Sequence, residues 1–317
     1  MLEETIPQAR FPVDLQVHTT CSDGSMSPED VVALAARVGI RALAITDHDS
    51  VEGVDRALDA GRRYGVEVIP AVELSLCNEP ERDFVDLDLL GYWIDHHHPL
   101  FEEALRKVVE GRIEQKRLQV QRLQEMGYQI TWEEVQARAK GVPGRPHLAQ
   151  VLMEKYPEEF PSMDAAFATV LRNDGPLYIP RPFALRLEDA AQLIRDVGGL
   201  PVLAHPGLYT EVRDVEGLVE RVAGLGVQGL EVWYPYDKTR VCRGCDKRQL
   251  HAFIRRFEQL ADRLGLLKTG GSDFHGLHKP IALGEQGLTW QQYVRLRAEV
   301  LGTGSGDRTR VNADKGA

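Results

Sequence analysis

Side chains that can bind a metal ion recur along this chain, each at or near the end of a short apolar run. Two examples are His48 in Thr46-Asp47-His48-Asp49 and His205 in Ala204-His205-Pro206. The full set is His18, Asp23, His48, Glu73, Asp88, His205, Asp273 and His275. Mixed imidazole and carboxylate ligands suit Mn²⁺, Zn²⁺ or Fe²⁺. One histidine at such a place is usually an ordinary hydrogen-bonded residue, but the repetition predicts a shared metal site.

The apolar runs beside these residues have the length and composition of buried strands. They span 11–17, 42–46, 66–72, 85–90, 200–204, 229–233 and 266–270. Helical patterns lie between most of them, and one begins with Ser27 as a suitable N-cap and Pro28 at the first helical position. The alternation predicts an α/β fold, a closed parallel barrel of about seven strands. Because parallel strands end on one face of a barrel, we expect the metal-capable side chains to converge there.

One stretch interrupts the alternation and contains helical patterns only. Residues 100–126, 145–156 and 162–171 are predicted helices, and Thr131 and Glu134 have capping-box spacing. We expect 100–180 to be a helical insert covering the active-site mouth, 11–99 and 181–300 to form the barrel, and 301–317 to be a flexible tail. The basic residues of the first helix alternate with acids, which favours a solvated face over contact with a polyanion. They are Arg106, Lys107, Arg112, Lys116, Arg117 and Arg122.

Composition narrows the class of protein and of partner. The 317 residues are 43% hydrophobic, and no apolar run approaches the roughly 20 residues that span a bilayer. The first ten residues lack a signal-peptide core, and the four cysteines form no disulfide-like framework, so we expect a cytoplasmic protein. The net charge of -10 argues against long duplex DNA as a partner, and the lack of a spanning run argues against a membrane. It leaves room for a small anionic substrate, because carboxylates loaded with metal can still attract phosphate.

Several stretches together resemble the motifs of the polymerase and histidinol phosphatase (PHP) superfamily. They are Asp14-Leu15-Gln16-Val17-His18-Thr19-Thr20-Cys21-Ser22-Asp23-Gly24, Thr46-Asp47-His48-Asp49, Glu73, Ala204-His205-Pro206 and Ser272-Asp273-Phe274-His275. The likeness is greatest to the nucleoside 3′,5′-bisphosphate phosphatases, which also trim short RNA 5′ ends. Gly144-Arg145-Pro146-His147-Leu148-Ala149 and residues 269–276 resemble that branch as well. The resemblance implies a distorted seven-stranded barrel, up to three metal ions, and a nucleotide or short oligonucleotide as substrate.

The resemblance also implies how the ligands are shared. One metal takes His18, Glu73 and Asp273, a second shares Glu73 and takes His205, and a third takes Asp23, His48 and His275. Two positions depart from the family pattern, because Gln16 and Asp88 stand where histidines are usual. Both can still offer an oxygen ligand, although an amide oxygen is neutral and weaker than an imidazole nitrogen. We therefore expect two to three divalent ions, Mn, Zn or Fe, with Gln16 and Asp88 among the ligands.

This ligand set predicts phosphoester hydrolysis by a metal-bound hydroxide held by Glu73, Asp273 and His205. The ions acidify the water, polarise the phosphoryl oxygens and neutralise charge in the transition state. Arg145 and His147 are candidates for gripping a phosphate that is not cleaved, because a planar guanidinium binds phosphate bidentately. The alternative interpretation of Arg145 is an ordinary surface residue at a helix start.

Two other functions stay open from the sequence. One is a phosphatase of another small metabolite, such as a sugar or amino-alcohol phosphate. The other is a metal- or nucleotide-binding module that has lost catalysis, which Gln16 and Asp88 would explain. Arg145 favours a substrate with a second anionic group. The C-x-x-C pair Cys242 and Cys245 lacks the two further ligands of a usual zinc site, and chance or a weak local metal site is favoured over redox chemistry.

Overall fold

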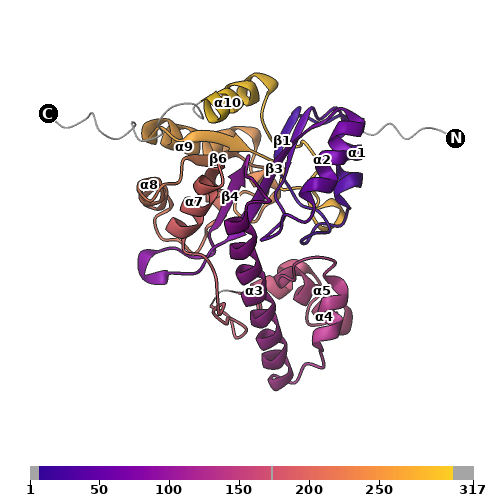
Figure 1. Ribbon diagram of the computed structural model, residues 1–317. Coiled ribbons are helices and arrows are strands. Elements are labelled where there is room, and N and C mark those ends of the chain that lie inside the picture. The colour runs from indigo at the N-terminus through magenta and orange to yellow at the C-terminus, as the bar shows by residue number, and fades with distance from the viewer. Residues whose placement is uncertain (1–6, 173, 303–317) are drawn as a thin grey trace.

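A seven-stranded sheet curls into a nearly closed barrel in the computed structural model, which describes residues 7–172 and 174–302 (Figure 1). The strands follow one another in chain order: β1 (Val13–Val17), β2 (Ala42–Ile45), β3 (Glu67–Ser75), β4 (Asp88–Tyr92), β5 (Leu200–Leu203), β6 (Gly229–Trp233) and β7 (Leu267–Gly270). The ends of the sheet meet in a parallel bridge between Val17 and Phe274, where the His18 amide donates to the Phe274 carbonyl at 2.9 Å. The predicted α/β barrel is confirmed, and the ligand-bearing ends of β1 and β7 are adjacent.

The strand β4 runs against its neighbours, which corrects the expectation of an all-parallel barrel. It pairs antiparallel with β3 and with β5, whereas the other neighbouring pairs are parallel. A parallel connection usually needs a crossover helix. The link from β3 to β4 contains only the short 3₁₀ helix η1 (Pro80–Arg82), so the chain turns back beside β3. Asp88, the first residue of β4, therefore pairs with Ser75 at the end of β3 and lies at the mouth.

Helices surround the barrel: α1 (Pro28–Val38), α2 (Val54–Tyr64), α7 (Leu187–Asp196), α8 (Val215–Gly224), α9 (Lys247–Leu264) and α10 (Trp290–Gly302). The start of α1 is confirmed, because the Ser27 side chain accepts from the Asp30 amide and Pro28 is the first helical residue. Leu15, Ala44 and Val202 belong to one apolar cluster, which α10 joins through Tyr293. The barrel is therefore a packed core and not a pore.

The insert expected between barrel segments consists of α3 (Pro99–Glu125), α4 (Trp132–Arg138), α5 (Arg145–Lys155) and α6 (Met163–Ala168). The predicted capping box of Thr131 and Glu134 is present, with both reciprocal hydrogen bonds. Figure 1 shows α4 and α5 beside the far part of α3, and an apolar cluster that includes Leu123, Leu148 and Phe160 holds them together. The division into barrel, insert and tail stays a prediction, and residues 303–317 of the tail lie outside the described residues.

One turn of the insert touches the barrel mouth directly. The Val142 amide donates to the Cys21 carbonyl at 3.2 Å. A Cβ on the neighbouring Gly141 would lie 2.0 Å from that same carbonyl oxygen. Only glycine therefore permits this close approach of the two backbones. The contact joins the insert to the turn that carries Asp23.

The structure bears on the predictions about membrane spans and about the cysteines. Over residues 7–172 and 174–302, no helix combines the length and the apolar character needed to cross a membrane. The cytoplasmic location stays a prediction. Cys242 and Cys245 form a disulfide just before α9, so they do not build the weak metal site that their spacing suggested. Cys21 and Cys77 are free thiols.

Candidate metal centre

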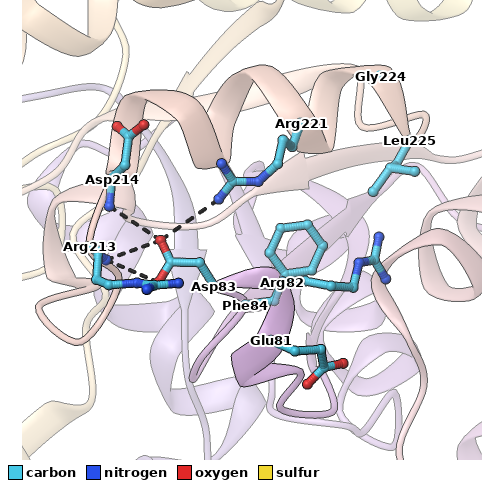
Figure 2. A pocket seen from close by; sticks show the side chains of 9 residues that line it. All are labelled: Glu81, Arg82, Asp83, Phe84, Arg213, Asp214, Arg221, Gly224 and Leu225. Atoms are coloured by element: carbon cyan, nitrogen blue, oxygen red, sulfur yellow. Dashed lines mark hydrogen bonds and ion pairs between the residues drawn. The ribbon is translucent and has the colours of Figure 1, made fainter.

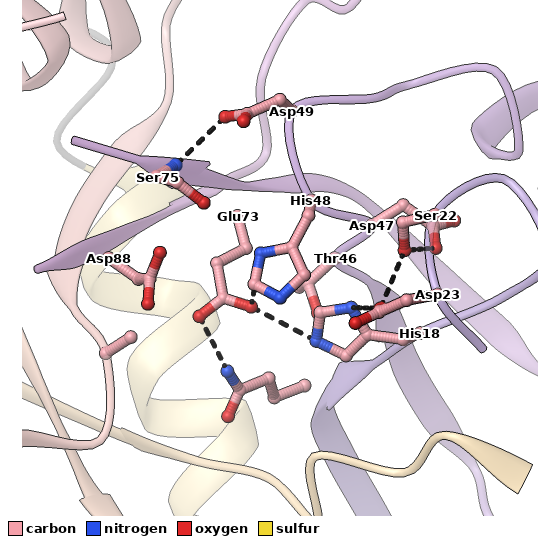
Figure 3. Close-up of polar contacts among 12 residues, drawn as sticks. His18, Ser22, Asp23, Thr46, Asp47, His48, Asp49, Glu73, Ser75 and Asp88 are labelled. Atoms are coloured by element: carbon pink, nitrogen blue, oxygen red, sulfur yellow. Dashed lines mark hydrogen bonds and ion pairs between the residues drawn. The ribbon is translucent and has the colours of Figure 1, made fainter. Parts of the chain in front are cut away.

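The metal-capable side chains come from separate elements and gather at the barrel mouth. His18 and Asp23 follow β1, His48 follows β2, Glu73 lies in β3 and Asp88 opens β4. Figure 3 shows these five side chains pointing toward one another. The later part of the chain adds His205 after β5 and, after β7, Asp273 and His275. The predicted convergence is confirmed as a placement, while the role of each side chain as a ligand stays a prediction.

One group of potential ligands is rich in imidazole. His18, Asp23, His48 and His275 each offer one atom, and these atoms lie within 4.8 Å of one another. His275 Nε2 is 3.3 Å from Asp23 Oδ1, and His18 Nδ1 is 3.7 Å from the same oxygen. The rings of His18 and His275 stack with their centroids 4.1 Å apart. This group contains the full set that the resemblance implied for the third metal.

A second group is richer in oxygen and is built around Glu73. His48, Glu73 and Asp88 form another set of atoms within 4.8 Å of one another. His205 Nε2 lies 3.0 Å from Glu73 Oε1 and 4.0 Å from Asp88 Oδ2. On the other oxygen, Glu73 Oε2 lies 3.1 Å from His18 Nε2 and 3.6 Å from His48 Nδ1. Glu73 therefore stands between the two groups, as a carboxylate shared by two metals would.

Several buried polar atoms at the mouth have no hydrogen-bond partner among the residues that the structure describes. They are both ring nitrogens of His18, His48 Nδ1, Glu73 Oε2, His205 Nδ1 and Gln16 Oε1. Their short distances to neighbouring ligands lack hydrogen-bond geometry. An orphaned buried polar group is costly and calls for an explanation, such as a bound ion. Converging imidazole nitrogens and carboxylate oxygens are the donors that a transition metal prefers, so these residues fit a metal centre.

The electrostatics of the centre are those of carboxylates balanced by imidazoles. Burial, and then the charge of Glu73, raises the pKa of Asp88 to about 7. Burial by itself lowers the pKa of His205, but its contact with Glu73 outweighs this and raises it to about 9. Burial lowers the pKa of His48 to about 4, which leaves a neutral imidazole. Metal binding must therefore expel protons from part of this set, and the affinity for metal falls as the pH falls.

Strained backbone fixes two of the ligand positions. His205 has φ 22° and Asp273 has φ 56°, in the left-handed region that residues other than glycine rarely adopt. The His205 amide donates to Glu231 Oε2 at 2.8 Å, and the Asp273 amide donates to the Gln16 carbonyl at 2.9 Å. These bonds hold the strained residues in place. Such strain commonly marks a functional site.

A buried carboxylate that is not a candidate ligand organises the loop after β1. Asp47 accepts from the Thr19 amide at 2.7 Å, from the Thr19 hydroxyl at 2.6 Å and from the Ser22 hydroxyl at 2.5 Å. His18 directly precedes Thr19 and Asp23 directly follows Ser22, so Asp47 holds the stretch between the two candidate ligands. The sequence analysis missed this role. The sequence feature that could have indicated this role is the position of Asp47 directly before His48 in the second motif.

The two departures from the family pattern both face Glu73. Gln16 Nε2 donates to Glu73 Oε1 at 3.1 Å, in the middle of the mouth. Its oxygen is among the orphaned atoms described above. Asp88 shares the second group of potential ligands with Glu73 and His48. Both positions therefore line the centre, as expected, but with weaker or harder donors than imidazole.

The substrate-binding candidates lie at the start of α5. Arg145 donates to both oxygens of Asp86 at 2.9 Å, which makes a bidentate pair. His147 is buried, and its Nδ1 accepts from the Gly144 amide at 2.9 Å. Burial lowers the pKa of His147 to about 4, so its ring is neutral.

Two basic residues of α3 correct the expectation of a solvated face. Arg112 is 8% exposed and Lys116 is 3% exposed. Arg112 forms a short ion pair with Asp49, which follows His48 in the chain. Arg181 approaches the same carboxylate at 3.5 Å and donates to the Ser75 carbonyl at 2.9 Å. The basic side of α3 therefore faces the mouth, because the helix packs one face against the barrel and the following segment of the insert.

A surface cavity of about 860 Å³ lies elsewhere, between the β3–β4 link and α8 (Figure 2). Arg82, Arg213 and Arg221 line it, but carboxylates engage all three. Arg213 Nε donates to Asp83 at 3.2 Å, Arg221 lies 3.8 Å from Asp83, and Arg82 donates to Glu79 at 2.9 Å. None of the metal-capable residues at the mouth lines this cavity. The chemistry therefore belongs to the mouth.

The sequence is similar to those of known proteins. A sequence model of the PHP domain matches residues 14–171. The chain is 34% identical to the phosphoribosyl 1,2-cyclic phosphate 1,2-diphosphodiesterase of Eggerthella lenta, over 83% of this chain and 94% of that protein. It is 30% identical to the 3′,5′-nucleoside bisphosphate phosphatase of Chromobacterium violaceum, over 83% and 87%. It is 32% identical to the 5′-3′ exoribonuclease Rnm of Escherichia coli, over 83% and 84%.

A solved structure is similar over nearly the whole fold. A protein of Bifidobacterium adolescentis, assigned as a metal-dependent phosphoesterase, superimposes with a TM-score of 0.76 at 27% identity. The match covers 92% of this chain and 96% of that chain. The barrel and the insert are therefore both part of the shared architecture.

Removal of one imidazole from the first group should lower metal content. We expect His48→Ala or His275→Ala to lose about one metal equivalent per chain, with activity falling in parallel, because three remaining donors hold an ion less tightly. Elemental analysis of the purified variants measures this. His251→Ala, an exposed histidine of α9, is the matched control. Unchanged stoichiometry in both test variants would remove the assignment of this group.

Restoring a nitrogen ligand at position 16 should strengthen the oxygen-rich side of the centre. We expect Gln16→His to raise affinity for Zn²⁺ about tenfold or more, because imidazole replaces an amide whose N–H now occupies Glu73. Calorimetric titration of metal-stripped protein measures it, with Gln291→His on α10 as the control. If neither metal affinity nor activity changes, Gln16 does not face a bound ion.

Proposed function

Because the chain belongs to the PHP domain family of metal-dependent phosphoesterases, we propose that it releases phosphate from nucleoside 3′,5′-bisphosphates, trims short oligonucleotides, or does both. The proposal includes two to three divalent ions, Mn, Zn or Fe, at the candidate centre. The substrate is a small phosphorylated molecule, and neither a membrane nor long duplex DNA is a partner. A cytoplasmic location is part of the same proposal.

The observation that carries the proposal is a basic cluster, largely withdrawn from solvent, near the metal-capable side chains. It consists of Arg112, Lys116, Arg145 and Arg181, all from the insert or its return segment. Arg112 and Arg181 share the carboxylate of Asp49, and Arg145 pairs with Asp86. Lys116 donates to the side-chain oxygens of Gln115 at 2.8 Å and Gln119 at 3.0 Å, both neutral acceptors. Four basic side chains gathered in one place favour an added anion. A second phosphate on the substrate would supply that anion.

The residues at the mouth of the barrel would have different roles in such a reaction. Bound divalent ions would supply an acidified water and neutralise charge on the phosphoryl group. Glu73, Asp273 and His205 would hold the ions on the side where the water attacks. Arg145 and His147 would bind the phosphate that is not cleaved, and the N-terminal end of the α5 dipole also favours an anion. The proposal thus separates a reacting phosphate at the barrel from a gripped phosphate at the insert.

Two alternatives have some support. A phosphatase of another small metabolite is favoured by the similarity to an enzyme named for a ribosyl cyclic phosphate. A catalytically impaired binding module would be favoured by Gln16 and Asp88 if the chain retained metal without turnover. Metal analysis combined with a phosphate-release screen over mono- and bisphosphorylated nucleotides separates all three. Turnover of bisphosphates far above monophosphates would support the main proposal.

The role of Arg145 predicts a selective defect. We expect Arg145→Ala to lower kcat/KM for a 3′,5′-bisphosphonucleotide roughly 30- to 1000-fold, which corresponds to about 2 to 4 kcal/mol for a lost charge-assisted contact. Hydrolysis of a simple aryl phosphate should change little, because it has no second phosphate. Arg138→Ala removes an arginine paired with Glu154 on the same insert and serves as the control. Equal losses on both substrates would mean that Arg145 supports the fold or the metal centre instead.

The basic cluster also predicts proton uptake on anion binding. Burial, and then the charges of Arg112, Arg181 and Arg145, lower the pKa of Lys116 well below its ordinary value. A bound dianion favours the ammonium form and raises this pKa, so anion affinity should increase as the pH falls toward neutrality. We expect metal-stripped protein to take up as much as about one proton per bound sulfate, measured by calorimetry in buffers of different ionisation enthalpy. Lys116→Met should abolish the uptake, and an uptake that persists in this variant contradicts the assignment.

A further inference from the structure

The carboxylate of Asp273 divides its two oxygens between different partners. Oδ1 faces the candidate ligands, at 3.3 Å from His18 Nε2 and 3.4 Å from His275 Nδ1. Oδ2 accepts from the Tyr234 hydroxyl at 2.6 Å and from Lys279 Nζ at 2.5 Å. One oxygen is thus free for a metal while the other is held by the protein. Tyr234 and Lys279 carry no motif signal, and the sequence analysis did not select them.

Lys279 brings a full positive charge to the edge of the mouth. It follows the short helix η4 (Gly276–His278), and 37% of its side chain is exposed. An ammonium has three N–H donors. Within the described part of the chain, Asp273 is the one hydrogen-bond partner of the Lys279 ammonium. Donors therefore remain for an acceptor that enters from the solvent side.

The Lys279 ammonium has a carboxylate partner and access to solvent at the same time. Nζ lies 2.5 Å from Asp273 Oδ2, and 37% of the side chain is exposed. It lies on the other side of the Asp273 carboxylate from His18, which faces Oδ1. A structural anchor for Asp273 would not need this charge, because the Tyr234 hydroxyl already holds the same oxygen.

We propose that Lys279 is a catalytic residue that donates a hydrogen bond from Nζ to a non-bridging oxygen of the phosphoryl group under attack. The inference rests on the proposed phosphoester hydrolysis and deepens it. A phosphoryl group that enters beside Asp273 comes within hydrogen-bond reach of an ammonium only 2.5 Å from that carboxylate. Negative charge on these oxygens is stabilised best by donors that are already in place.

The reaction balances without proton transfer from Lys279. The oxygen of water forms the new bond to phosphorus, and the ester bond between phosphorus and the leaving oxygen breaks with its electron pair going to that oxygen. One proton of the water ends on the leaving alcohol and the other stays with the released phosphate. Lys279 keeps its three protons throughout and acts by charge and hydrogen bonding alone.

The test compares Lys279→Met and Lys279→Arg with the unchanged protein, using an aryl phosphate as substrate. Lys238→Met is the matched control, because Lys238 has a similar exposure of 38% and pairs with Glu285 instead of a candidate ligand. For each protein, kcat, KM, metal content by elemental analysis and melting temperature are measured. We expect Lys279→Met to lower kcat roughly 100-fold with metal content and melting temperature unchanged. Lys279→Arg should recover at least part of that loss, because it keeps the charge.

Three outcomes would overturn the assignment. A kcat for Lys279→Met that stays near that of the unchanged protein removes the catalytic role. A loss of metal in proportion to activity means that Lys279 acts only by positioning Asp273. A Lys279→Arg variant as inactive as Lys279→Met shows that charge is not the contribution. If the unchanged protein hydrolyses no phosphoester, the proposed function itself is wrong. That result differs from the three outcomes above, which all require an active unchanged protein.

Discussion

The arrangement of the mouth depends on one buried carboxylate, that of Glu73. Its oxygens reach side chains carried by separate strands: His18 and His48 on one side, Gln16 and His205 on the other. A charge removed from water costs several kcal/mol unless partners surround it. The register of β2 and β3, the antiparallel return of β4 and the closure of β1 onto β7 each bring partners to this group. The barrel geometry and the polar centre therefore require each other.

Around that centre, other buried carboxylates hold loops instead of ions. Asp14 accepts from the Ser272 amide at 2.8 Å and from the Gly284 amide at 2.8 Å, which ties the start of the chain to its last loops. Burial raises the pKa of Asp14 to about 6, although these hydrogen bonds lower it. Asp47 holds the loop after β1 by hydrogen bonds in the same way that Asp14 holds the last loops. Such bonds orient ligands before an ion arrives, and they reduce the cost of ordering the site on binding.

The sequence could predict the positions that strand ends determine. The place of His48, His205 and Asp273 at the barrel mouth could be predicted, because each follows an apolar run that is recognisable as a strand. Parallel strands end on the same face of a barrel. The direction of β4 could not be predicted, because an apolar run does not show which way the strand runs. The burial of Arg112 and Lys116 could not be predicted either, because their spacing among acidic residues is also that of a solvated helix. Only the packing of the insert decides which side of α3 is buried, and this depends on contacts distant in sequence.

The close approach of Gly141 to Cys21 has a thermodynamic consequence for the centre. The turn that receives the insert also carries Asp23, so the two surfaces share a few residues of backbone. One backbone hydrogen bond contributes only about 1 kcal/mol, which makes this contact a coupling between two units and not a clamp. If an ion bound at Asp23 and an anion bound at the basic cluster, as proposed, an ion that ordered the turn would lower the cost of seating the insert, and a seated insert would lower the cost of ordering the turn. Linked equilibria are reciprocal, so each binding event would then strengthen the other by the same factor.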